Sequence, residues 1–101
     1  MGAAKQNKMN SSESNQVSLE VVRASGKIEK IDVPKSDLLM ELQSLIDGYI
    51  EAVPMKYDPS HLVIANEEGL LRHLPWNKLA SDLTRQTIVG DAVVVKVEDF
   101  S

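Results

Sequence analysis

The chain has 101 residues, no cysteine, 43% hydrophobic residues and a formal net charge of −4. These values are typical of one soluble globular domain, and they exclude a disulfide scaffold, a thiol nucleophile and a thiolate metal site. The acidic balance disfavours duplex DNA binding, and the lack of a long apolar run or an apolar leader predicts a cytoplasmic protein without membrane contact.

The first 16 residues are rich in Asn, Ser, Gln and Lys and have few apolar side chains. Such a segment cannot bury enough surface to offset its ordering entropy, so we predict a disordered tail over 1–16 and a single domain over 17–101. Apolar residues alternate with polar ones over 17–24, which indicates a half-buried strand. A turn at 25–27 and a second strand over 28–33 complete a predicted hairpin.

The clearest helix is predicted between Pro34 and Gly48. Ser36 is its expected N-cap, and Gly48 is expected to take the left-handed conformation that ends it. The apolar residues recur at helical spacing and form one face suited to packing across a sheet. These residues are Leu38, Leu42, Leu45 and Ile46.

Two strands are predicted next, over 49–55 and 61–66, and Pro54 confines the first to an edge, a bulge or an end. A turn over 67–69 follows, in which Gly69 is expected to have a positive φ. Residues 70–74 are interpreted as a short strand paired with 61–66. A second, shorter helix is predicted over 75–85, with Trp76 packed against the core.

The last predicted strand covers 93–97, and Asp91 just before it is expected to bond backbone amides at the strand entrance. Because this strand is rich in valine, we expect it to be buried on both faces and inserted beside an early strand. The element order β-β-α-β-β-α-β predicts an α+β domain. Its mostly antiparallel sheet has about five strands, with one long helix on a face and one short helix at an edge.

Known catalytic and metal-binding motifs are absent from the sequence, including phosphate loops, dinucleotide fingerprints and calcium loops. His61 and His73 are twelve residues apart, which fits no metal template, so neither a metal nor a cofactor is predicted. Glu67 and Glu68 are chain neighbours, and in an extended segment their side chains point to opposite sides. A solvated hairpin tip therefore explains them better than an acid–base pair.

Two residues at the start of the second helix admit either a structural or a binding role. Trp76 either packs in the core or anchors an interface. Asn77 either caps the helix or recognises a ligand. Basic and aromatic residues nearby permit a local patch for single-stranded nucleic acid, but the acidic balance of the chain argues against a nucleic-acid partner.

Four short motifs follow one another along the chain: GYIE at 48–51, NEEG at 66–69, LPWN at 74–77 and IVGDA at 88–92. In these motifs the chain resembles a family of small uncharacterised domains. Members are common in bacteriophages, plasmids and bacteria, with scattered occurrence in large viruses and eukaryotes. The resemblance covers residues 18–97 and implies a shared fold and a set of polar positions, but no reaction.

Candidate ligand- or partner-binding residues are the polar and aromatic positions in these motifs that a plain core does not require. If the loop 66–77 folds over the sheet, several of them meet in an acidic rim suited to a cationic or hydroxyl-rich ligand or to basic side chains of a partner. The competing explanation is structural, with capping, turn and bulge roles. The candidates are Glu51, Asn66, Glu67, Glu68, Trp76, Asn77 and Asp91.

We therefore predict a non-enzymatic binding module whose surface comprises 47–51, 66–77 and 90–91. Its expected ligand is a protein or a small polar molecule, in phage–host or mobile-element biology. Two alternatives stay open: a small hydrolase or transferase with an acidic site, and a homodimerising accessory domain that pairs through the 49–55 strand. The predicted state is accordingly a monomer or a homodimer.

Overall fold

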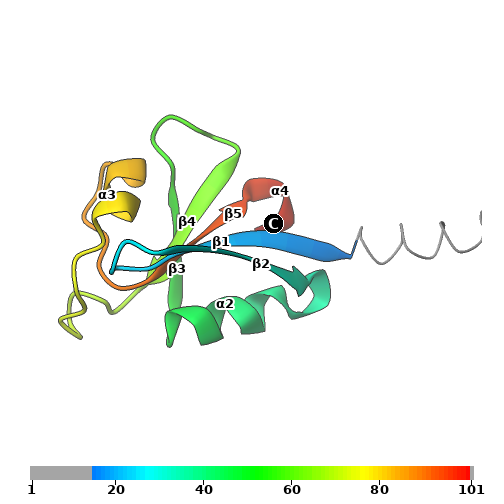
Figure 1. Ribbon diagram of the computed structural model, residues 1–101, viewed down its shortest axis with the longest axis horizontal. Helices are drawn as coiled ribbons and strands as arrows, with labels where there is room; N and C mark the ends of the chain where they lie inside the picture. The colour runs from blue at the N-terminus through cyan, green and yellow to red at the C-terminus, as the bar shows by residue number, and fades with distance from the viewer. Residues whose placement is uncertain (1–14, 101) are drawn as a thin grey trace, which may run out of the picture.

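The computed structural model describes residues 15–100, which form a five-stranded antiparallel sheet with helices on both faces (Figure 1). The predicted α+β class is confirmed. The strands are β1 (Gln16–Val22), β2 (Ile28–Pro34), β3 (Ile50–Pro54), β4 (His61–Asn66) and β5 (Ala92–Lys96). The helices are α2 (Leu38–Ile46), α3 (Lys78–Thr84) and α4 (Val97–Phe100), and the 3₁₀ turn η1 (Lys35–Asp37) precedes α2.

The spatial order of the strands is β2-β1-β5-β4-β3. Two hairpins, β1–β2 and β3–β4, form the two halves of the sheet, and β5 lies between them with an antiparallel neighbour on each side. The predicted insertion of the last strand beside an early one is therefore confirmed. Four consecutive residues of β5, from Ala92 to Val95, are buried, as expected for a central strand covered on both faces.

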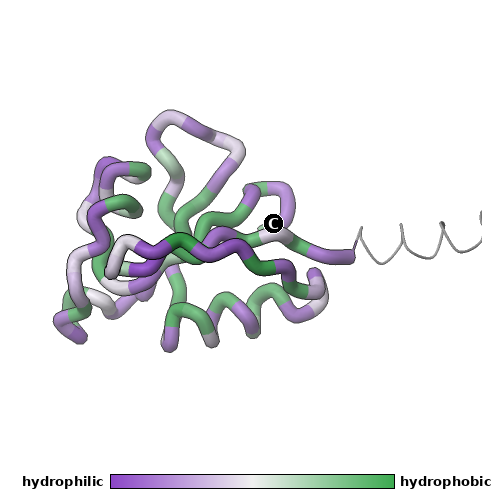
Figure 2. The backbone as a smooth tube through the Cα atoms, in the orientation of Figure 1, coloured by the Kyte–Doolittle hydropathy of each residue, from purple (hydrophilic) through white to green (hydrophobic). Residues whose placement is uncertain are grey.

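Two apolar cores lie on opposite faces of the sheet. Helix α2 covers one face and contributes Leu38, Leu42 and Ile46, which are spaced four residues apart as the sequence predicts. Helix α3 covers part of the other face, where Ala80 packs with Ile88 and Val63. Figure 2 shows the hydrophobic residues concentrated along the strands and on the helix segments that face them.

The ends of α2 differ from the sequence prediction. Ser36 is not its N-cap, because the 3₁₀ turn occupies 35–37 and α2 begins only after Asp37, with no side-chain capping bond. At the other end Asp47 takes the left-handed conformation (φ 62°), one position before Gly48. The helix therefore ends where the sequence predicts, but Asp47 and not Gly48 takes the left-handed conformation.

The predicted short strand over 70–74 is wrong. Residues 67–73 form consecutive turns, in which Arg72 N–H donates to the carbonyl of Glu68 (2.9 Å) and Leu74 N–H donates to that of Gly69 (3.1 Å). These bonds satisfy the backbone locally, so no strand pairing is needed. Among residues 15–100 the glycines with positive φ are at 26, 48 and 90, so the positive φ expected of Gly69 is also wrong.

The C-terminal strand ends one residue earlier than predicted, at Lys96, and the short helix α4 follows from Val97. The part of the predicted N-terminal tail that covers residues 1–14 lies outside the described residues. Within residues 15–100, no helix has the length and apolar character needed to cross a membrane.

Candidate functional site

Three segments that are distant in the sequence meet at one end of the molecule: the end of α2, the loop between β4 and α3, and the turn before β5. Together they line a cleft of about 220 Å³. These segments overlap the predicted binding surface of 47–51, 66–77 and 90–91, but of the seven candidate residues only Asp91 lines the cleft. The cleft is lined by Leu45, Ile46 and Asp47 from the helix end, Arg72, Leu74 and Pro75 from the loop, and Gly90 and Asp91 from the turn.

Asn66 connects the loop to the end of α2. The residue is 4% exposed, and its Nδ2 donates to the carbonyls of Ile46 (3.3 Å) and Asp47 (3.4 Å). Its Oδ1 accepts from the backbone N–H of Glu68 (2.8 Å). The amide thus satisfies carbonyls that the helix end leaves without intrahelical partners, and it also starts the turns of the loop.

Arg72 reinforces the same connection from the surface. Its guanidinium donates to the carbonyl of Asp47 (2.6 Å) and contacts the Asp47 carboxylate (3.3 Å). A cation at a helix C-terminus is also favoured by the helix dipole. Sequence reasoning did not single out this contact, because an exposed arginine in a loop carries no pattern that names its partner.

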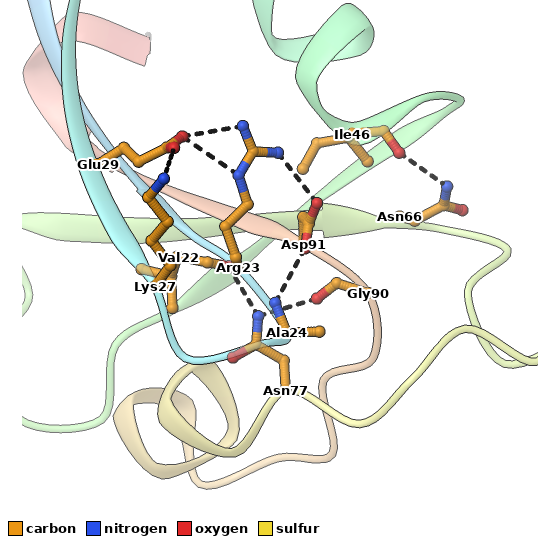
Figure 3. A network of polar contacts seen from close by, with 10 residues as sticks. All are labelled: Val22, Arg23, Ala24, Lys27, Glu29, Ile46, Asn66, Asn77, Gly90 and Asp91. Carbon is orange, nitrogen blue, oxygen red and sulfur yellow. Dashed lines mark hydrogen bonds and ion pairs between the residues drawn. The ribbon is translucent and has the colours of Figure 1, made fainter.

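Asn77 makes three hydrogen bonds and is 1% exposed. Its Oδ1 accepts from the N–H of Ala80 (3.0 Å), so Asn77 caps α3, which is one of the two roles that the sequence left open for it. Its Nδ2 donates to the carbonyls of Val22 (2.8 Å) and Gly90 (2.9 Å), as Figure 3 shows. One amide therefore holds together the start of α3, the end of β1 and the turn before β5.

Asp91 extends this network to the β1–β2 hairpin (Figure 3). Its carboxylate accepts from the backbone N–H of Ala24 (2.9 Å). Asp91 therefore bonds a backbone amide as predicted, but that amide belongs to the β1–β2 turn and not to the entrance of β5. It also pairs with Arg23 (3.0 Å), which in turn pairs with Glu29 (2.9 Å). Hydrogen bonds to Asp91 and then Glu29 raise the pKa of Arg23, and the bond from Arg23 lowers the pKa of Glu29.

Two glycines allow the loop to lie close to the 88–91 segment. A Cβ on Gly69 would lie 2.7 Å from Val89 Cγ2, and one on Gly90 would lie 2.8 Å from Leu74 Cδ1. Gly90 additionally has φ +81°. The glycine of the NEEG motif is therefore required by close packing and not by its backbone angle.

The remaining candidates face solvent. Glu51, Glu67 and Glu68 are exposed. Trp76 is 57% exposed, so the predicted core packing is wrong. Its backbone forms a β-bridge with Val89 and its indole N–H donates to Ser81 Oγ (3.0 Å), which holds the ring at the surface.

Three further apolar residues are exposed at this end of the chain's fold and were missed by sequence reasoning. Leu70 is 69% exposed, Leu71 is 81% exposed and Tyr49 is 67% exposed. The backbone bond from Glu67 N–H to the carbonyl of Tyr49 (2.9 Å) brings Tyr49 beside the start of the loop. The predicted strand over 70–74 placed the two leucines in the sheet, so their exposure was not expected.

A serine, a histidine and an aspartate also meet on the β3–β4 connection, but not as a catalytic relay. Ser60 Oγ and Asp58 Oδ2 both contact the same ring atom, His61 Nδ1, at 2.9 Å. A nucleophile relay needs the serine on Nε2 and the acid on Nδ1. Hydrogen bonds from Ser60 lower the pKa of Asp58. Residues 15–100 contain no group of three or more His, Asp or Glu arranged to hold a metal ion.

Comparison with known families gives one finding. A family model described as "Domain of unknown function (DUF3846)" matches residues 18–101. The match covers most of the chain, so the chain belongs to this family, as its four motifs indicated. Comparisons with curated proteins and with solved structures give no significant match.

Proposed function

We propose that this DUF3846 domain is a protein-interaction module that binds its partner through the exposed side of the loop 67–76 and the adjacent Tyr49. The observation that carries the proposal is the exposure of Leu70, Leu71 and Trp76 on a loop that is fastened at both ends. Large apolar side chains in solvent at one end of a small domain are typical of an interface anchor.

The fastening matters because a rigid loop loses little entropy when it binds. Asn66 and Arg72 tie the loop to the end of α2, and Asn77 ties it to β1 and to the turn before β5. The buried amides thus support the proposal as positioning residues, whereas the exposed side chains make the contact.

The charge of the loop favours a particular kind of partner. Glu67 and Glu68 lie at its start and Glu51 on the neighbouring strand, all exposed, whereas Arg72 is already paired with Asp47. We therefore propose a partner surface with an apolar centre and a basic rim, because complementary charges steer association and select partners.

The size of the cleft favours a protein partner over a small molecule. At about 220 Å³ it is smaller than the roughly 300–1,000 Å³ of typical small-molecule pockets. It is large enough to receive one side chain of a docked protein.

A photo-crosslinking amino acid at position 71 tests the proposal in a lysate of the encoding organism, with position 40 on α2 as the matched control. Met40 is 66% exposed and Leu71 is 81% exposed, so both positions face solvent. We expect a crosslinked protein at position 71 only. After purification that protein should bind the wild-type chain in a titration, and the affinity should fall with added salt.

Two double variants separate the loop from general surface effects. Leu70→Ser/Leu71→Ser and Glu67→Lys/Glu68→Lys should each abolish binding of the purified partner, while Leu39→Ser/Met40→Ser on α2 should not. Retention of binding in both loop variants, or an equal loss in the α2 variant, would contradict the proposal. Far-UV circular dichroism checks that each variant is folded.

A further inference from the structure

The strand β2 is an outer strand of the sheet, and its backbone geometry defines which residues have free hydrogen-bonding groups. Arg23 N–H donates to Lys27 O at the hairpin turn (2.8 Å), and Lys35 N–H donates to Asn15 O at the other end (2.6 Å). Hydrogen-bonded and non-bonded pairs alternate along an antiparallel ladder. The odd-numbered residues of β2 therefore bond β1, and the even-numbered ones direct their backbone groups outward.

The outward residues carry charges of opposite sign two positions apart. Lys30 and Asp32 are both exposed, and both point to the sheet face that α2 does not cover. Two β2 strands can pair antiparallel with Ile31 of one copy opposite Ile31 of the other. Lys30 of each copy then lies opposite Asp32 of the other copy, so the two-fold axis relates two such pairs. In this register the pairs 30–32 are also the ones that exchange backbone hydrogen bonds.

We propose that a second copy of this chain pairs along β2 in this register and joins the two sheets into one of ten strands. The central backbone bonds, between Lys30 and Asp32, and the side-chain charges select the same register, as an isologous interface needs. The outer pair, Ile28 with Pro34, lacks one bond at each end because proline has no N–H. A charged side chain on an edge strand normally prevents pairing. Here the spacing of Lys30 and Asp32 prevents pairing with unrelated strands and favours pairing with an identical one.

The other outer strand, β3, lacks this self-complementarity. Glu67 N–H donates to Tyr49 O and Met55 N–H donates to His61 O, so the outward residues of β3 are Ile50, Ala52 and Pro54. A pair centred on Glu51 would set Glu51 opposite its own copy, which is destabilising. A pair centred on Ala52 would bring together no opposite charges, and it would lose bonds at Pro54 just as the β2 pair does at Pro34, because proline has no N–H. The proposed dimer edge is therefore β2, in place of the 49–55 strand of the open alternative.

The proposed dimer also extends an existing groove. The uncovered sheet face holds a hollow of about 400 Å³, lined by side chains that include Lys30, Asp32, His61 and Lys96. Lys30 and Asp32 form its boundary on β2, so pairing would bring the hollows of the two copies to the two-fold axis. The interface is separate from the loop 67–76 and does not depend on the function proposed for it.

Charge reversal with rescue tests the register. In sedimentation of the full chain, the wild type should dimerise, and Lys30→Asp or Asp32→Lys should each weaken the dimer by about tenfold or more. An equimolar mixture of the two variants should form a heterodimer, visible by its mass in native mass spectrometry, because every facing pair is then opposite in charge. The matched control Lys56→Asp, an exposed lysine that follows the opposite outer strand β3, should dimerise as the wild type does.

Amide exchange gives a test that needs no variant. The amides of Lys30 and Asp32 should be protected at high protein concentration and exchange quickly at low concentration, whereas that of Ile31, bonded within the monomer, stays protected at both. A wild type that stays monomeric at millimolar concentration, single variants that dimerise normally, a mixture without heterodimer, or unprotected Lys30 and Asp32 amides would each overturn the proposal.

Discussion

The Asn77→Ala substitution tests whether the amide network holds the candidate site together. The variant loses the α3 cap, which contributes about 1 kcal/mol. It also leaves the carbonyls of Val22 and Gly90 without their buried donor, at about 1 kcal/mol each. The expected loss is therefore about 3 kcal/mol, a large share of the stability of a domain of this size.

Urea titration followed by circular dichroism measures this loss, and a thermal scan should show a Tm lower by roughly 10–25 °C. Lys78→Ala is the control, because Lys78 is the next residue and makes only an exposed pair with Asp82 (2.9 Å). That pair contributes about 0.5 kcal/mol or less.

The Asn77→Asp substitution separates the capping bond to Ala80 from the two bonds that connect Asn77 to Val22 and Gly90. An aspartate keeps the acceptor for Ala80 N–H but turns an oxygen toward the carbonyls of Val22 and Gly90, so it should be nearly as unstable as the alanine variant. A loss below about 1 kcal/mol for Asn77→Ala, or near wild-type stability for Asn77→Asp, would refute the bridging role.

Three further predictions concern other parts of the fold. Gly69→Ala should destabilise by about 1–3 kcal/mol through its clash with Val89, and Val89→Ala should recover part of that loss in a double-mutant cycle measured in urea. Glu29→Gln should unfold at lower urea than wild type at pH 7. The bond from Arg23 lowers the pKa of Glu29 below its ordinary value of 4.5, so this stabilisation is complete above about pH 4.5 and is lost as pH falls through the lowered pKa; equal differences at pH 7 and pH 2 would contradict the pairing. Leu42→Ala, at a fully buried site, should cost about 2–5 kcal/mol in the same titration, and a loss under 1 kcal/mol would contradict its placement in the core.

Regular elements were predictable because their burial leaves a periodic pattern. The strand His61–Asn66 has the predicted bounds at both ends. Helix α2 buries Leu38, Leu42 and Ile46, as their helical spacing predicted. The position of β5 was also predictable, because a run of consecutive apolar residues is typical of a central strand covered on both faces.

The loop was not predictable in the same way, because its conformation depends on side-chain bonds to distant segments. Leu70 and Leu71 suggested a strand, but the bond from Glu68 N–H to Asn66 Oδ1 starts a turn before them. Trp76 suggested core packing, but its bridge to Val89 keeps it at the surface. Sequence reasoning found the cap at Asn77 and missed its two longer bonds, since nothing local marks partners that come from other strands.

The position of β5 has a consequence for how the chain is made. Of the five strands of this sheet, the last to be synthesised is the one that joins the two hairpins, because β1–β2 and β3–β4 contact each other within the sheet only through it. A nascent chain that lacks Ala92–Lys96 can form both hairpins, but each leaves an apolar edge uncovered. Completion of the sheet must therefore await the emergence of β5 from the ribosome. Folding should be slow relative to a domain built from local contacts, and a chain stalled before β5 should be exposed to aggregation.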